Sequence, residues 1–252
     1  PRDLHIDPQD GWARRTIDRP AARNALNTAL LAAIAAELGR LADDATCRAV
    51  LLTGANGNFA AGADIAEIEH KTSAQGAADP RKQHWAAIRA FPKPLVAAVD
   101  GFALGGGLEL ALMADCLVLG ATARLGLPET SLGLIPGAGG GQRLMALVGR
   151  ARATRLVLSG EIIDAATAHA WGLSGWLAEG EALPVAIELT RRLATRAPLA
   201  LQAAKRALVL GDEAALALGP ERAGFEALLD SADKAEGIRA FRDKRKPVFR
   251  GE

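Results

Sequence analysis

Short runs of apolar residues alternate with longer amphipathic stretches over the first half of the chain. Four runs predict β-strands because they are short and rich in apolar residues: Trp12–Ile17, Arg48–Thr53, Leu95–Val99 and Cys116–Leu119. Between the first two runs, apolar residues recur at helical spacing: Leu26, Leu30, Ile34, Leu38 and Leu41. This spacing predicts an amphipathic helix, and Asn27 is suited to cap its N-terminus.

Three shorter segments complete this half. Asp64 and Glu67 have the spacing of a capping box that opens a helix. The polar stretch from Lys71 to Pro80 predicts a loop, and a helix is expected from about Arg81 to Ala90, ahead of two prolines. A glycine-rich turn should lead into a helix over Leu108–Ala114.

From about residue 138 onward the pattern becomes almost wholly helical, with one short strand predicted at Leu173–Leu177. The expected helices are Gln142–Val148, Ala151–Leu158, Asp164–Trp171, Leu183–Thr195, Leu199–Leu208, Glu213–Leu229 and Ala232–Lys244. Strands mixed with helices, followed by helices alone, predict an α/β core with a helical C-terminal part. We place the core at residues 1–196 and the helical region at residues 197–252.

Composition narrows the class of protein. Half of the 252 residues are hydrophobic and the formal net charge is +1, so nothing indicates a nucleic-acid partner. No apolar stretch reaches membrane-spanning length, no signal peptide is visible, and a cytoplasmic protein is expected. The four histidines lack ligand spacing, so no metal is expected. Cys47 and Cys116 sit in or beside apolar runs and are interpreted as small hydrophobic residues.

Two glycine-rich turns stand out, at residues 101–107 and 137–141. Neither has the G-x-G-x-x-G spacing of a dinucleotide site or the lysine of a phosphate-binding loop. Residues 105–107 open a predicted helix, where unpaired N–H groups and the helix dipole favour a developing oxyanion. A tight turn that permits close helix packing explains the same glycines equally well.

Two glutamates are candidates for acid–base chemistry. Glu109 has apolar neighbours on every face of its predicted helix, which indicates a buried carboxylate, and burial raises the pKa of an acid toward useful values. Glu129 follows Pro128, and a proline followed by an acid is also an ordinary helix start. Spacing alone leaves both interpretations of Glu129 open.

Four segments then resemble the crotonase (enoyl-CoA hydratase/isomerase) family along nearly the whole chain: Arg19–Leu26, Phe59–Ile65, Lys93–Leu110 and Ala123–Gly140. The resemblance implies an α/β fold, a spiral of β-β-α units with C-terminal helices that make trimer contacts. It also implies a homotrimer or a hexamer built from two trimers. The family's oxyanion hole would fall on the backbone N–H groups of Ala63 and Gly106.

The same resemblance assigns Glu109 and Glu129 as the pair that adds water across the double bond of an enoyl-CoA. Which is acid and which is base stays open. Family members that only move the double bond typically keep one acid, so both together favour hydration over isomerisation. A catalytically silent CoA-binding homologue is the other alternative. A serine peptidase on a related spiral fold would need a serine–histidine pair, and no histidine lies near the glycine turns.

Coenzyme A would enter as part of the acyl-CoA substrate, so no separate cofactor is expected. The resemblance places it against Arg23, Ala61, Asp64, Ile65, Phe225, Phe241 and Lys244, the last three from the C-terminal region. Three positions depart from the family pattern without removing a catalytic group. Asp100 replaces a frequent asparagine, Gly141 replaces a common threonine, and Ala66 stands where some members have a lysine.

A narrower resemblance concerns the substrate. Pro20–Leu26, Ala123–Glu129, Pro198–Lys205 and Glu236–Phe241 are similar to hydratases that act on 2,3-dehydroadipyl-CoA in bacterial phenylacetate degradation. Such a substrate ends in a carboxylate, which a basic residue near the acyl pocket would favour. The candidates are Arg81, Lys82, His84 and Arg89, although a solvated helix face explains them more simply.

Overall fold

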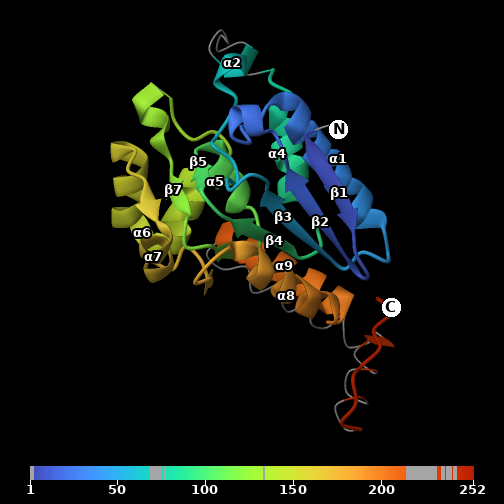
Figure 1. Cartoon of the computed structure of the whole chain (residues 1–252). Helices are drawn as coiled ribbons and strands as arrows, with labels where there is room; N and C mark the ends of the chain where they lie inside the picture. Colours follow the sequence, from blue (N-terminus) through green and yellow to red (C-terminus); the bar gives the residue numbers. More distant parts are fainter. Residues whose placement is uncertain are drawn as a thin grey trace.

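A computed structural model describes residues 3–68, 75–76, 78–132, 134–213, 232–233, 236, 240 and 243–252 (Figure 1). Its main feature is a six-stranded sheet in the order β1-β2-β3-β4-β6-β9. The strands are β1 (Leu4–Pro8), β2 (Trp12–Ile17), β3 (Ala49–Gly54), β4 (Leu95–Val99), β6 (Cys116–Leu119) and β9 (Trp176–Leu177). Only β1 runs antiparallel to its neighbour, and the other pairs are parallel.

Alternate residues of the central strands enter two separate cores. Val50 and Leu52 of β3 pack on the side of α1 (Thr28–Asp43) and α4 (Arg81–Arg89). Ala49 and Leu51 pack on the other side, against α8 (Ala182–Ala194). Helices therefore cover both faces of the sheet, as Figure 1 shows. This explains why the central parallel strands β4 and β6 are continuous apolar runs instead of alternating ones.

A smaller sheet carries the elements around the glycine turns. It has the order β5-β7-β8, from β5 (Phe102–Leu104), β7 (Arg124–Gly126) and β8 (Ile163–Asp164). The helical elements around it are α5 (Gly106–Ala111), the 3₁₀ helix η2 (Pro128–Leu132), α6 (Gly140–Ser159) and α7 (Ala165–Ala170). The remaining ones are η1 (Pro20–Ala22), α2 (Ile65–Ile68) and α9 (Pro198–Glu213). The fold is thus mixed α/β, as the sequence predicted.

Many predicted elements are confirmed within one or two residues. Of the strand predicted at Leu173–Leu177 only Trp176–Leu177 forms, and the helix predicted to end at Leu208 continues to Glu213. Asn27 caps α1, since its side-chain Oδ1 accepts the Leu30 N–H at 2.7 Å. The helices predicted on either side of residue 149 form α6, which is kinked at Gly149, where φ is 76°. Of the predicted helix Glu213–Leu229 only Glu213 is described, as the last residue of α9. Within the predicted helix Ala232–Lys244, the described residues 232, 233, 236 and 240 are helical, whereas 243 and 244 form a turn. The division at residue 196 stays a prediction.

The prediction of a capping box at Asp64 and Glu67 was right for the aspartate and wrong for the glutamate. Asp64 does cap α2, because its Oδ1 accepts the Ala66 N–H at 3.1 Å. The Asp64 N–H, however, donates to the Leu26 carbonyl at 3.0 Å and is not reached by Glu67. Glu67 Oε2 instead accepts the N–H and the hydroxyl of Thr28, at 2.8 and 2.7 Å. The glutamate therefore ties α2 to the first turn of α1.

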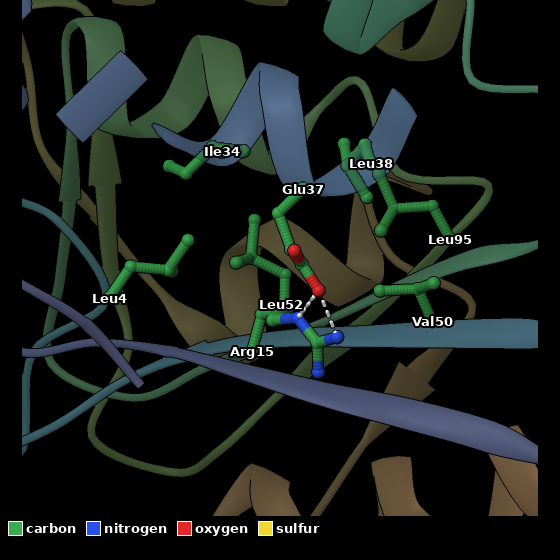
Figure 2. A pocket seen from close by; sticks show the side chains of 8 residues that line it. All are labelled: Leu4, Arg15, Ile34, Glu37, Leu38, Val50, Leu52 and Leu95. Carbon is green, nitrogen blue, oxygen red and sulfur yellow. Dashed lines mark hydrogen bonds and ion pairs between the residues drawn. The ribbon is translucent and has the colours of Figure 1, made fainter. Parts of the chain in front are cut away.

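A buried ion pair crosses the interface between β2 and α1 (Figure 2). Arg15 is 2% exposed, and its Nε donates to Glu37 Oε1 at 2.9 Å. Burial on its own raises the pKa of the Glu37 carboxyl, but hydrogen bonds from Arg40 and Arg15 outweigh it, and the pKa is lowered overall. Apolar side chains and this pair line a cavity of about 10 Å³. A void of that size has room for no substrate.

No helix in the described ranges is both long and apolar enough to cross a bilayer.

Candidate active site

Glu109 lies in the first turn of α5, directly after β5. Gly105, with φ 49° and ψ −126°, makes the sharp bend between the strand and the helix. Glu109 is 4% exposed, and its Oε1 accepts the N–H groups of Ala138 and Gly140 at 2.7 and 2.9 Å. Gly140 is the first residue of α6, so a second helix start faces the carboxylate. Backbone donors and helix dipoles thus stabilise its negative charge.

Glu129 reaches the same place from η2. A Cβ added to Gly105 would lie 3.0 Å from Glu129 Oε1, so the carboxylate rests against the bend that opens α5. Its other oxygen, Oε2, is buried and accepts no hydrogen bond within the described part of the chain. Burial raises the pKa of the Glu129 carboxyl, and the charge of Glu109 raises it further. A raised pKa in a carboxylate pair is typical of acid–base catalysis.

Two backbone donors face the same helix start. The Leu26 N–H donates to Gly62 O at 2.8 Å and the Asp64 N–H to Leu26 O at 3.0 Å, so the Ala63 N–H between them points away from Leu26. A Cβ added to Gly106 would lie 3.5 Å from Ala63 N. Among the described residues, neither the Ala63 N–H nor the Gly106 N–H has an acceptor. Two adjacent unpaired donors suit an oxyanion.

Asn24 positions the loop that carries Ala63, and sequence reasoning missed it. Its side-chain Nδ2 donates to the carbonyls of Ala55 and Asn58 at 2.9 and 2.7 Å, and its Oδ1 accepts the Arg19 N–H at 2.8 Å. Asn24 is buried, with φ 62°, a conformation that asparagine tolerates better than most residues. Asn24 lies within Arg19–Leu26, one of the four segments that resemble the crotonase family, and this resemblance could have drawn attention to it.

The residues predicted to contact CoA differ in how exposed they are. Arg23 is exposed, and its carbonyl accepts the N–H of half-buried Ala61 at 3.1 Å. Asp64 forms an ion pair with Arg19 at 2.7 Å, while Ile65 is 58% exposed. Lys244 is exposed and belongs to none of the contacts above. Phe225 and Phe241 lie outside the described residues.

The four basic candidates for a substrate carboxylate also differ. The Arg81 guanidinium donates twice to buried Asp79, at 3.0 and 2.7 Å, which gives it a structural role. Lys82 and Arg89 are exposed, and His84 is half-buried.

Asp100, one of the departures from the family pattern, accepts the Ala182 N–H that opens α8, at 3.1 and 3.2 Å. Its carboxylate therefore caps a helix.

Comparison with known proteins defines the class to which this fold and site belong. The family model for enoyl-CoA hydratase/isomerase matches residues 8–252, so the chain is a member of that family. It is 48% identical to the 2,3-dehydroadipyl-CoA hydratase of Escherichia coli (strain K12), with 99% of each chain covered. It is 40% identical to a probable enoyl-CoA hydratase of Rhizobium meliloti (strain 1021), over 98% of this chain and 97% of that one.

Solved structures agree with this membership. The crystal structure of an enoyl-CoA hydratase from Bacillus anthracis superposes with a TM-score of 0.93 at 33% identity, over 99% of this chain and 100% of that one. An enoyl-CoA hydratase structure from Mycobacterium tuberculosis H37Rv gives a TM-score of 0.90 at 34% identity, with 99% of each chain covered. Sequence and structure therefore identify the same family along the whole chain.

Proposed function

We propose that this protein is an enoyl-CoA hydratase that adds water across the 2,3 double bond of a 2-enoyl-CoA to give a 3-hydroxyacyl-CoA. The observation that carries the proposal is the meeting of Glu109 and Glu129 at the start of α5, beside the unpaired N–H groups of Ala63 and Gly106. The names of the relatives support the same reaction.

In the proposed mechanism the thioester oxygen accepts hydrogen bonds from Ala63 N–H and Gly106 N–H. A water held between the carboxylates loses a proton to one glutamate as its oxygen bonds to C3. The C2=C3 electrons move toward the thioester and give an enolate, and a proton returned from the glutamate pair to C2 completes the addition. One oxyanion donor of this kind stabilises the transition state by about 2.7–4 kcal/mol.

We place the CoA portion of the substrate along Arg23, Ala61, Asp64 and Ile65, and at Phe225, Phe241 and Lys244. Because Asp64 is already paired with Arg19, its side chain would orient the loop and its backbone would face the ligand. The C-terminal region 197–252 would complete this site and make the contacts of a homotrimer or hexamer. A cytoplasmic location fits this metabolic role.

The proposed physiological substrate is 2,3-dehydroadipyl-CoA, with phenylacetate catabolism as its pathway. Its support is the 48% identity to a relative of that name, together with the basic residues Lys82, His84 and Arg89 on α4. Arg81 is a weaker candidate for the terminal carboxylate because Asp79 occupies its guanidinium.

A matched pair of substrates tests this proposal. The purified protein is given 2,3-dehydroadipyl-CoA and trans-2-hexenoyl-CoA, which has the same chain length without the carboxylate, and loss of the conjugated thioester absorbance is followed. We expect hydration of both, with a kcat/KM at least about tenfold higher for the dicarboxylic substrate, since one ion pair supplies roughly 1.4 kcal/mol or more. Equal or reversed preference would contradict the substrate, and no hydration of either would contradict the reaction.

A further inference from the structure

Arg143 faces the turn that holds Glu109 from the side opposite the carboxylate. Its Nη1 donates to the carbonyl of Ala138 at 2.8 Å, one helical turn after the start of α6. The Ala138 N–H points the other way and donates to Glu109 Oε1 at 2.7 Å. The turn of residues 138–140 therefore lies between a guanidinium and a carboxylate, each bonded to its backbone.

The two glycines of this turn lie against Arg143 on one side and Glu109 on the other. Gly139 adopts φ 90°, and a Cβ there would lie 2.8 Å from Arg143 Nη1. A Cβ at Gly140 would lie 2.8 Å from Glu109 Cγ. Both side chains thus lie close against the backbone of the turn, and the positive φ at Gly139 itself favours glycine. A turn of this kind needs an external restraint, because glycine loses more conformational freedom on ordering than any other residue.

From this geometry we infer that Arg143 is a positioning residue for Glu109. The guanidinium fixes the Ala138 carbonyl, and the peptide planes of the turn then hold the N–H groups of Ala138 and Gly140 toward Glu109 Oε1. Arg143 touches no reacting atom itself. The inference rests on the proposed function, since it concerns how one of the two hydratase carboxylates is held in place.

A cavity on the far side of the turn makes this inference testable by chemical rescue. The cavity measures about 840 Å³, and Gly139, Gln142 and Arg143 line it, together with Arg89 and with Met113, which follows α5. A small cation that enters this cavity would reach the place of a deleted Arg143 side chain.

The test compares Arg143→Ala and Arg143→Lys with Arg150→Ala, an exposed arginine on the same helix. We expect kcat for trans-2-hexenoyl-CoA to fall about 10- to 100-fold in Arg143→Ala, with KM changed less than about twofold, because positioning acts on the chemical step. Arg143→Lys should lose less, and added guanidinium chloride at millimolar concentration should restore kcat severalfold in Arg143→Ala alone. Exchange of the backbone amides of residues 137–141 should become faster in Arg143→Ala and stay unchanged in Arg150→Ala.

Three results would overturn the inference. The first is a kcat in Arg143→Ala within about twofold of wild type, or a loss that Arg150→Ala shares. The second is a loss that neither lysine nor guanidinium lessens, which would mean a packing role only. The third is unchanged amide exchange over residues 137–141. A wild type that hydrates nothing would instead contradict the proposed function, and the exchange comparison would still test the turn.

Discussion

Neighbouring glycines in the turn before and within α6 have different surroundings. A Cβ at Gly140 would lie 2.8 Å from Glu109 Cγ and 3.1 Å from its Oε1, whereas a Cβ at Gly141 would find its nearest neighbour, Val157 Cγ2, at 4.0 Å. Gly141 is also the position where the family commonly has threonine. The Glu109 carboxylate thus leaves no room for a side chain at residue 140, whereas residue 141 has space for one.

This difference gives a matched pair of variants. Gly140→Ala should displace Glu109 and lower kcat for hydration about 10- to 100-fold, since a shift near 1 Å is enough for such a loss. Overpacking should also lower the free energy of unfolding by about 1–3 kcal/mol. Gly141→Ala should keep wild-type kcat. Steady-state kinetics and urea unfolding of both variants check this, and similar kcat values for the two would contradict it.

The Glu129 carboxyl shows that the site is assembled at the expense of stability. Burial and the charge of Glu109 raise its pKa in the folded state, so the ionised form is disfavoured there. This destabilising effect is fully present above the raised pKa and disappears as the pH falls through it. Replacing Glu129 with neutral glutamine should therefore remove activity while leaving the fold at least as stable at neutral pH.

At the scale of helices and strands, sequence pattern predicted what depends on local signals. The runs at β2, β4 and β6 were placed with correct bounds. β4 and β6 are continuous apolar strands between turns, and such strands have few other interpretations. The strands β5 and β7 were missed, since each has three residues and is stabilised mainly by pairing with the other. Such short strands are defined by tertiary contacts, which periodicity does not contain.

The ammonium group of Lys205 on α9 contacts residues that precede strands β4 and β6 of the large sheet. Lys205 Nζ lies 2.8 Å from Asp115 Oδ2, donates to the Lys93 carbonyl at 2.8 Å, and sits 5.3 Å from the centre of the Phe91 ring. Burial raises the pKa of the Asp115 carboxyl, and the charge of Lys205 opposes that rise. Removing the lysine would leave the partly exposed Asp115 carboxylate without its cation.

Lys205→Met should therefore destabilise the protein by about 1–3 kcal/mol at neutral pH, between the values for exposed and for buried ion pairs. Because Lys205 opposes the rise in the Asp115 pKa, the variant should have a higher Asp115 pKa than the wild type. The loss should be largest above the variant's pKa and should shrink as the pH falls from there toward the wild-type value. Urea midpoints measured at several pH values check the expectation, with exposed Arg206→Met on the same helix as the control. A destabilisation that is independent of pH would contradict the ion-pair explanation.

At the scale of the whole molecule, the site combines segments far apart in the chain. Glu109 bonds to residues 29 and 31 positions later, and Ala63 lies beside Gly106. Local pattern indicated Glu109 and the helix start at residues 105–107 as candidates, but only the family resemblance joined them to Ala63, because no local spacing relates them. Sequence reasoning did not foresee Asn24, which bonds to carbonyls more than 30 positions later, or the turn at Gly139, which meets Glu109 only once α5 and α6 have packed together.

The most direct measurement is hydration of trans-2-hexenoyl-CoA by the wild type, Glu109→Gln and Glu129→Gln, with thermal unfolding of each protein recorded alongside. We predict hydration by the wild type and a fall in kcat of about a thousandfold or more in each variant, since each acid–base group contributes roughly 10²–10⁴-fold. The unfolding temperature of Glu129→Gln should equal or exceed that of the wild type. A folded variant that retains wild-type kcat, or a folded wild type that does not hydrate the substrate, would contradict catalysis by this pair of carboxylates.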